Sequence, residues 1–113
     1  MSKKQPNLYE GMYILSAQLN EDARIKAFEK IKSAITSYGG EVVKIHDQGK
    51  RRLAYTVGPH REGYYYLMYF TVQPEVIEEL WEQYRLNENL VRYLTIRTDK
   101  VLDELKFKQL VEQ

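Results

Sequence analysis

Apolar residues recur along the N-terminal third of the chain with two different spacings, which predict a strand followed by a helix. Residues 8–15 are rich in aromatic and branched side chains, as strands are. Asn20 then suits the capping position of a helix. The apolar residues that follow it at helical spacing are Ala23, Ala27, Phe28, Ile31, Ala34, Ile35 and Tyr38. They predict a helix of about five turns, which the glycines at 39 and 40 end.

The middle of the chain is typical of two further strands joined by a loop. Residues 41–57 are long for a single strand, and Gly49 within them indicates a bulge or a bend rather than a tight hairpin. The segment from Gly58 to Gly63 carries the strongest loop signals in the chain. Residues 64–72 are strongly β-prone and predict the next strand.

The last third predicts a second helix and a final strand. Pro74 suits the first position of a helix. The apolar residues that would form one face of this helix are Val76, Ile77, Leu80, Trp81 and Tyr84. Residues 90–98 predict the last strand. The tail, residues 99–113, carries apolar residues among charges, and both a short helix and a disordered arm that orders on a partner remain open.

The order βαββαβ predicts an α+β fold in which two right-handed crossovers interleave into a four-stranded antiparallel sheet. Both helices would then cover one face of the sheet. The other face would be open, yet the first strand is apolar at both parities, with Met12 and Ile14 alternating with Tyr13 and Leu15. An exposed apolar face is usually an interaction surface, although the pattern alone does not fix which parity faces the helices.

Composition narrows the class of protein. One domain is expected for 113 residues. The chain has no cysteine, which excludes disulfides, thiol catalysis and cysteine-rich zinc sites. It contains no apolar run of the roughly 20 residues that a membrane span needs, and no apolar stretch follows the charged start as in a secretory signal. We therefore expect a cytoplasmic protein that does not enter a membrane.

Charge is unevenly distributed, although the net charge is only +1. Residues 44–61 hold five basic residues and one acid, which gives +4, whereas residues 75–88 hold five acids and one base, which gives −4. A polyanion would be attracted to the first segment and repelled by the second. The most basic run is Lys50, Arg51 and Arg52, where arginine offers planar donors that match phosphate oxygens, although such a run is also typical of a solvated sheet edge.

Catalytic chemistry is not indicated. The chain has no glycine-rich phosphate loop before a helix and no histidine pair at metal spacing. His46 and Asp47 are the one candidate for a proton-transfer pair, but neighbouring residues of a strand point to opposite faces. We therefore expect no enzyme activity, no cofactor, no metal and no small-molecule substrate.

Tyrosines leave a second binding hypothesis open. Tyr64, Tyr65, Tyr66 and Tyr69 lie on the predicted third strand, where RNA-recognition motifs place aromatic side chains that stack on bases. Residues 62–69 can be aligned with that motif, except that Glu62 replaces a basic residue and Tyr65 a small one. A stand-alone module that binds single-stranded RNA would then use Tyr64 and Tyr66.

Several segments together resemble the bacterial ribosomal small-subunit protein six family over about residues 8–98. The segments that carry the resemblance are Tyr9-Glu10, Tyr38-Gly39, Gly49-Lys50-Arg51-Arg52-Leu53-Ala54-Tyr55, Gly63-Tyr64-Tyr65 and Asn89-Leu90-Val91-Arg92-Tyr93. The resemblance implies a ferredoxin-like fold and a structural role in the small ribosomal subunit, without a cofactor.

The same resemblance implies the partners and the binding residues. It implies joint binding, with ribosomal protein eighteen, to the central domain of 16S ribosomal RNA. Position by position, it assigns RNA binding to Arg51, Arg52 and Arg92, with Lys50 and Arg97 as weaker matches. The domain organisation expected is a flexible N-terminus (1–7), a ferredoxin-like RNA-binding domain (8–98) and a C-terminal tail (99–113).

Overall fold

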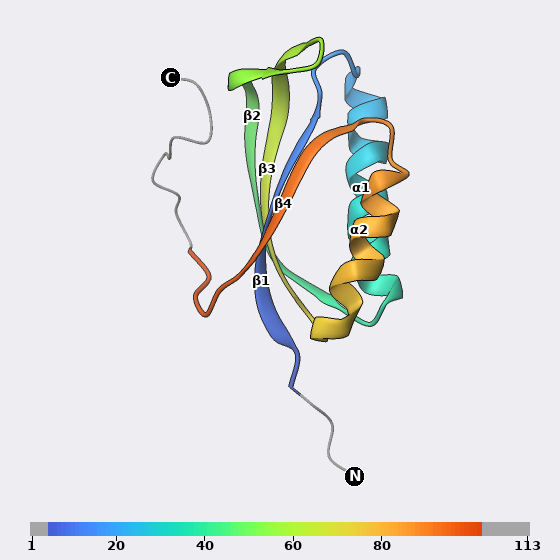
Figure 1. Ribbon diagram of the computed structural model, residues 1–113, viewed down its shortest axis with the longest axis vertical. Coiled ribbons are helices and arrows are strands. Elements are labelled where there is room, and N and C mark those ends of the chain that lie inside the picture. Colours follow the sequence, from blue (N-terminus) through green and yellow to red (C-terminus); the bar gives the residue numbers. More distant parts are fainter. Residues whose placement is uncertain (1–4, 103–113) are drawn as a thin grey trace.

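The computed structural model describes residues 5–102, without the side chains of residues 54 and 55. Its elements are β1 (Asn7–Ser16), α1 (Glu21–Ser37), β2 (Glu41–Val57), β3 (His60–Val72), the short 3-10 helix η1 (Pro74–Val76), α2 (Ile77–Arg85) and β4 (Leu90–Arg97). The strands form one antiparallel sheet in the order β2-β3-β1-β4, and both helices cover the same face (Figure 1). The predicted ferredoxin-like α+β fold is confirmed.

The ends of α1 follow from the residues that flank it. The Asn20 side chain accepts a hydrogen bond from the Ala23 backbone N–H at 2.8 Å, as a helix cap does. At the other end, Gly39 adopts a φ of +84°, and the N–H of Gly40 donates to the carbonyl of Ile35 at 2.9 Å. Only glycine adopts such a left-handed conformation without strain, so the glycine pair ends the helix as the sequence predicts.

Two boundaries differ from the sequence prediction. The predicted loop from 58 to 63 is wrong over most of its length, because β3 begins at His60 and only the Gly58-Pro59 turn separates it from β2. Glu62 pairs with Arg52, and His60 pairs with Val57, so hydrogen bonding across the hairpin extends both strands. Pro74 does open the second helical segment, but it starts the turn η1, and α2 begins at Ile77.

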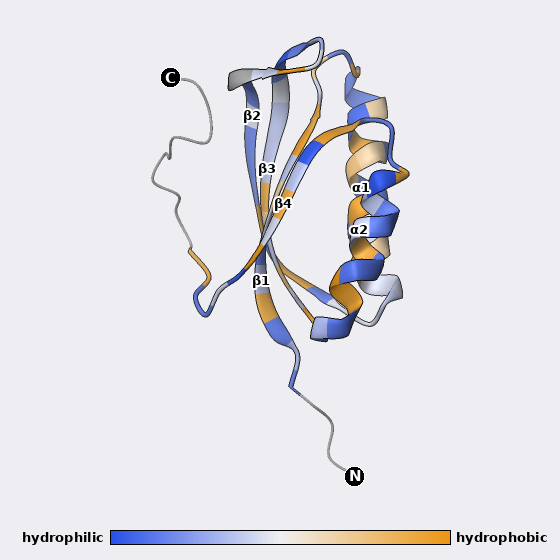
Figure 2. Cartoon of the chain, in the orientation of Figure 1, coloured by the Kyte–Doolittle hydropathy of each residue, from blue (hydrophilic) through white to orange (hydrophobic). Residues whose placement is uncertain are grey.

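The main core lies between the helices and the sheet. Its largest fully buried side chains include Tyr13, Ile31, Phe70 and Leu80. Phe28 of α1 stacks on Tyr66 of β3, with ring centroids 4.1 Å apart. Figure 2 shows apolar positions alternating with polar ones along both helices, and the buried positions are the apolar ones.

A second apolar cluster lies on the open face of the sheet. It consists of Met12, Ile14, Leu53, Tyr65, Leu67 and Tyr69, with Leu8, Val57, Val91 and Val101 packed against it. Leu94 and Ile96 of β4 are also on this face, since they pair with Met12 and Glu10, and they are 44% and 49% exposed. The expectation that the face away from the helices is apolar is therefore confirmed.

The layer of helices is joined to β4 through the single tryptophan of the chain. Trp81 of α2 is 38% exposed, and its indole N–H donates to the hydroxyl of Thr95 on β4 at 3.4 Å.

No helix in the part of the chain that the structure describes is long and apolar enough to cross a bilayer. The predicted tail, residues 99–113, is described only as far as Leu102, where it forms neither helix nor strand. Its remaining residues, 103–113, lie outside the described residues, as do residues 1–4.

Candidate nucleic-acid interface

A bulge in β2 decides which way the basic run points. The pairing register with β3 shifts between Asp47 and Gly49, where Gly49 has a φ of +76° and donates its N–H to the Asp47 carboxylate at 2.9 Å. Lys50 then lies opposite Tyr64, which packs on the helix-side core. Because successive strand residues alternate, Lys50 and Arg52 lie on the helix side and Arg51 lies on the open face.

Lys50 and Arg52 line a polar cavity of about 700 Å³ beside the β2–β3 turn. Arg61 and His60 line the same cavity from β3. The other lining residues are Ala17, Gln18, Leu53, Thr56, Pro59 and Glu62. The cavity thus gathers three permanent positive charges against the one carboxylate of Glu62, which makes it suited to an anionic group such as a phosphate.

A fourth cation extends this positive region on the helix side. The guanidinium of Arg24, in the first turn of α1, lies 4.5 Å from the ring centroid of Tyr64, and the Lys50 ammonium lies 5.9 Å from the same ring. Arg24 also donates to the Tyr66 hydroxyl at 2.6 Å and lies 3.8 Å from the Asp47 carboxylate. The aromatic ring of Tyr64 therefore attracts both of these cations.

Two more cations lie on the open face at the same end of the sheet. The Arg51 Nε–H donates to the carbonyl of Gln48 at 3.1 Å, and Arg92 lies opposite Ile14 on β4. The residue that faces Arg51 on β3 is Gly63, where a Cβ atom would overlap the Cγ2 atom of Ile14 and lie 3.0 Å from the carbonyl oxygen of Leu15. A residue with a Cβ atom would therefore force Ile14 or the adjoining backbone to shift beside Arg51.

The five residues predicted for RNA binding do not form one group. Lys50, Arg51, Arg52 and Arg92 all lie at the end of the sheet where β1 ends and β4 begins, distributed over both faces. Arg97 lies at the opposite end, because it pairs with Tyr9 near the start of β1. The structure therefore does not bring Arg97 to the other four.

Sequence reasoning missed two cations of this region. Arg61 belongs to the basic segment but is predicted to lie in a loop, and the β2–β3 pairing brings it to the cavity. No local signal in residues 60–63 would have located it, because these residues become a strand only through pairing with β2. Arg24 lies on a helix with an ordinary amphipathic pattern, so only the fold reveals its position beside Tyr64.

The tyrosines do not form the stacking platform of an RNA-recognition motif. Tyr64 and Tyr66 face the helices, where Tyr66 stacks on Phe28 and burial raises the pKa of its hydroxyl. The aromatic residues that β3 directs to the open face are Tyr65 and Tyr69, which are only 4% and 1% exposed. The mechanism of base stacking through Tyr64 and Tyr66 is therefore wrong, because those rings are on the other face of the sheet.

Neither histidine belongs to a catalytic arrangement. His46 lies opposite Leu67 on the open face, whereas Asp47 lies opposite Tyr66 on the helix side and beside Arg24. The expected separation of this pair onto opposite faces is confirmed. Within residues 5–102, no three histidine, aspartate or glutamate side chains come together as a metal site would require.

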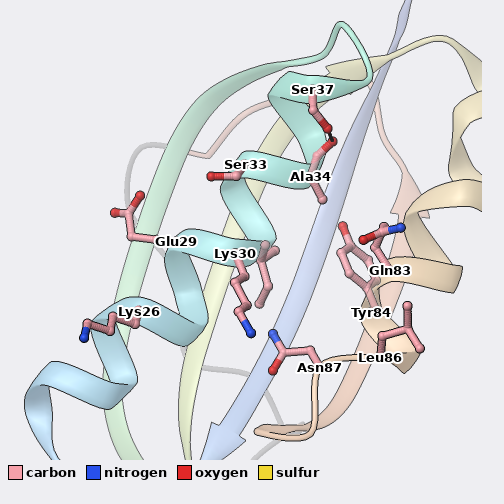
Figure 3. A pocket seen from close by; sticks show the side chains of 11 residues that line it. Lys26, Glu29, Lys30, Ser33, Ala34, Ser37, Gln83, Tyr84, Leu86 and Asn87 are labelled. Carbon is pink, nitrogen blue, oxygen red and sulfur yellow. Dashed lines mark hydrogen bonds between the residues drawn. The ribbon is translucent and has the colours of Figure 1, made fainter.

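A second hollow is a groove between the two helices (Figure 3). Lys30 points into it toward Asn87, with Gln83 and Tyr84 on the opposite wall. Its buried polar groups already have partners, because Tyr84 bonds Tyr13 and Asn87 bonds the Ala27 carbonyl and the Asn89 N–H. These hydrogen bonds tie the groove's buried polar groups to the fold itself.

The structure thus defines a ferredoxin-like α+β protein with basic residues on both faces of one end of its sheet. The family model described as ribosomal protein S6 matches residues 8–97. The chain is 56% identical to small ribosomal subunit protein bS6 of Protochlamydia amoebophila, covering all of this chain and 99% of that protein. It is 58% identical to the protein of that name in Chlamydia abortus, covering 99% of this chain and all of that one.

The chain belongs to the ribosomal protein S6 family and is thus a component of the small ribosomal subunit, not an enzyme. The crystal structure of ribosomal protein S6 from Thermotoga maritima superposes with a TM-score of 0.78 at 29% identity, covering 82% of this chain and 88% of that one. The C-terminal domain of MgtC from Mycobacterium tuberculosis shares the fold alone, with a TM-score of 0.60 at 11% identity, covering 92% of this chain and all of that one.

Proposed function

We propose that residues 8–98 bind the central domain of 16S ribosomal RNA jointly with ribosomal protein eighteen. The observation that carries this proposal is the position of the basic end of the sheet next to the apolar open face. Cations line the cavity on the helix side, and two arginines lie beside the apolar cluster on the other side. One molecule thus presents a surface for phosphate groups that adjoins a surface for a protein.

The RNA-binding step is recognition of the nucleic-acid backbone. Lys50, Arg52 and Arg61 neutralise phosphates at the cavity, and Arg51 and Arg92 do so from the open face. Each neutralised phosphate releases condensed counterions, so affinity falls as salt rises. Contacts of this kind fix the position of the protein without reading base edges.

The protein partner occupies the open face of the sheet. Leu94 and Ile96 are partly exposed there beside the buried cluster around Met12 and Ile14. Such a continuous apolar face is characteristic of a protein contact. A net charge of only +1 also favours joint binding, because a protein with so little excess positive charge gains little affinity for RNA by itself.

The test is filter binding of a central-domain RNA fragment, pre-assembled with any earlier-binding protein it requires, with and without ribosomal protein eighteen over a salt series. We expect weak binding alone and strong, salt-dependent binding with the partner. The double variant Lys50→Ala/Arg52→Ala loses up to two phosphate contacts, so the slope of log affinity against log salt falls by about two.

Two further variants locate the site. Arg51→Ala/Arg92→Ala tests the open-face arginines in the same way, and Arg97→Ala is the matched control, because Arg97 lies at the far end of the sheet. Equal affinity with and without the partner contradicts joint binding. A loss with Arg97→Ala that equals the loss with Arg52→Ala contradicts the assignment of the site to the end near the β2–β3 turn.

A further inference from the structure

The chain turns back over the open face of the sheet after β4. The N–H of Thr98 still donates to the carbonyl of Leu8 at 2.9 Å, in continuation of the β1–β4 pairing. The next residues then leave the edge of the sheet and return on the side opposite the helices (Figure 1). We refer to residues 98–102 as the strap.

The strap is attached to the open face at β2 and β3. The His46 Nε2–H donates to the carbonyl of Leu102 at 2.8 Å, and the Leu102 backbone also hydrogen-bonds Tyr69. Val101 packs against the apolar cluster of the open face. Because His46 is on β2 and the strap begins at the β4 edge, these few residues cross β1 and β3.

Within the described residues, the strap contacts one end of the open face. Its contacts are with His46, Tyr69 and Leu8, which lie toward the end of the sheet where β1 begins. Arg51 and Arg92 are on the same face but toward the end where β1 finishes. The contacts of the strap are therefore at the end of the open face away from these two arginines.

The attachment of the strap is slight compared with a regular strand. Asp99 and Lys100 are exposed, and Leu102 is 40% exposed. The Leu102 contacts with His46 and Tyr69 and one packed valine hold the segment beyond Thr98 to the sheet. A partner with a larger apolar surface would displace so small a contact, since the burial of apolar surface contributes most of the favourable free energy of association.

We propose that the strap competes with the protein partner for the open face, so that binding of the partner requires release of Leu102 from His46. This inference depends on the proposed function only for the identity of the partner. The strap covers apolar residues at the end that it contacts in the unbound protein. Partner binding then exchanges an intramolecular contact for an intermolecular one, so the apparent affinity is the intrinsic affinity multiplied by the fraction of molecules in which the strap is released.

The test measures partner affinity and apolar exposure in the full chain. His46→Ala removes the hydrogen bond to Leu102, and Val101→Ala weakens the packed contact. We expect each variant to bind ribosomal protein eighteen about three- to tenfold more tightly, on the scale of one lost hydrogen bond or one reduced apolar contact. Each should also increase the fluorescence of the apolar dye bis-ANS. Leu86→Ala is the control, because Leu86 is 75% exposed beyond α2, on the other side of the sheet.

The outcomes separate the strap from the proposed function. Weaker or unchanged partner binding in both variants overturns the competition, whatever the dye reports. If the unaltered chain and all variants fail to bind ribosomal protein eighteen, the proposed function is wrong. In that case the bis-ANS fluorescence tests the strap by itself. Unchanged fluorescence in both variants shows that the strap does not cover apolar surface, and an increase shows that it does.

Discussion

Two tyrosine hydroxyls are hydrogen-bonded to each other inside the main core. The Tyr13 and Tyr84 oxygens are 2.8 Å apart, and their rings meet edge to face at a centroid distance of 5.3 Å. Burial raises the pKa of Tyr84 to about 12, to which Tyr93 adds and against which the hydrogen bond to Tyr13 acts. Burial also raises the pKa of Tyr13 well above its usual value of 10. In the folded state the pair therefore stays protonated to a higher pH than free tyrosine does.

This pair predicts a loss of stability at alkaline pH. In the unfolded chain both tyrosines ionise near pH 10. The folded state holds the two hydroxyl protons more tightly than the unfolded chain does. The stabilisation that this provides is complete below pH 10 and is lost as the pH rises from about 10 to about 12. For Tyr84 the loss is about 3 kcal/mol. Urea unfolding at a series of pH values from 8 to 12 measures this loss of stability.

Tyr84→Phe provides the comparison for this prediction. The variant removes one ionisable hydroxyl and leaves Tyr13 without its partner, so it is less stable at pH 8 by about 1–2 kcal/mol. Its stability then declines less steeply between pH 10 and pH 12. A decline as steep as in the unaltered chain would assign the alkaline transition to other groups.

Gly63 predicts a steric effect at the candidate interface. A methyl group at this position overlaps the Cγ2 atom of Ile14, so Gly63→Ala should lower the free energy of unfolding by about 1–3 kcal/mol. Chemical denaturation measures this loss. The same substitution in an Ile14→Ala background should cost less, because the overlapping atom is absent. Equal costs in the two backgrounds would show that the glycine matters for another reason.

Among the elements, α1 depends on a single capping contact at its start. The Asn20 side chain accepts from Ala23 at 2.8 Å, and Glu21 and Asp22 follow it in the first turn. Asn20→Ala should therefore lower the free energy of unfolding by about 1 kcal/mol in chemical denaturation. Asn20→Asp retains the acceptor and should leave stability nearly unchanged. A loss in both variants would contradict the role of the cap.

The sequence predicted the elements well where the signal was local. The helix cap, the glycine stop and the bulge at Gly49 were all anticipated, since each depends on the conformational preferences of a few neighbouring residues. The start of β3 was not, because residues 60–63 become a strand through pairing with β2 rather than through their own preference. Turn-forming residues such as Gly63 conceal that pairing in a single sequence.

The faces of the candidate site were the hardest part to predict. The basic residues themselves are plain in the sequence, but the bulge changes the parity of β2 between Asp47 and Gly49. A one-residue shift reverses the face of every later side chain. Strand pairing, and not the sequence pattern, therefore places Lys50 and Arg52 on one face and Arg51 on the other. It also places Arg97 at the far end of the sheet.

Acidic and basic residues lie in different parts of the molecule. The acids of α2, including Glu78 and Glu79, lie on the helix layer, whereas the cations gather around the β2–β3 turn and the adjoining strand ends. Glu88 is exposed and lies beside the cations, because its neighbour Asn89 accepts a hydrogen bond from Ser16 at the end of β1. Glu88→Gln should raise the RNA affinity about twofold at 0.05 M salt, because it removes repulsion acting over a Debye length of more than 10 Å. Filter binding should show no difference at 0.5 M salt. A difference that persists there would indicate direct contact.

The single tryptophan makes one surface of the molecule optically distinct. Trp81 contacts Thr95 across the seam between α2 and β4, away from both basic surfaces. Its fluorescence emission is sensitive to how α2 packs on the sheet. Addition of RNA or of the protein partner should therefore leave the emission spectrum unchanged if both bind where we propose. A spectral shift during assembly would mean that the helix layer is remodelled, or is itself contacted, inside the ribosome.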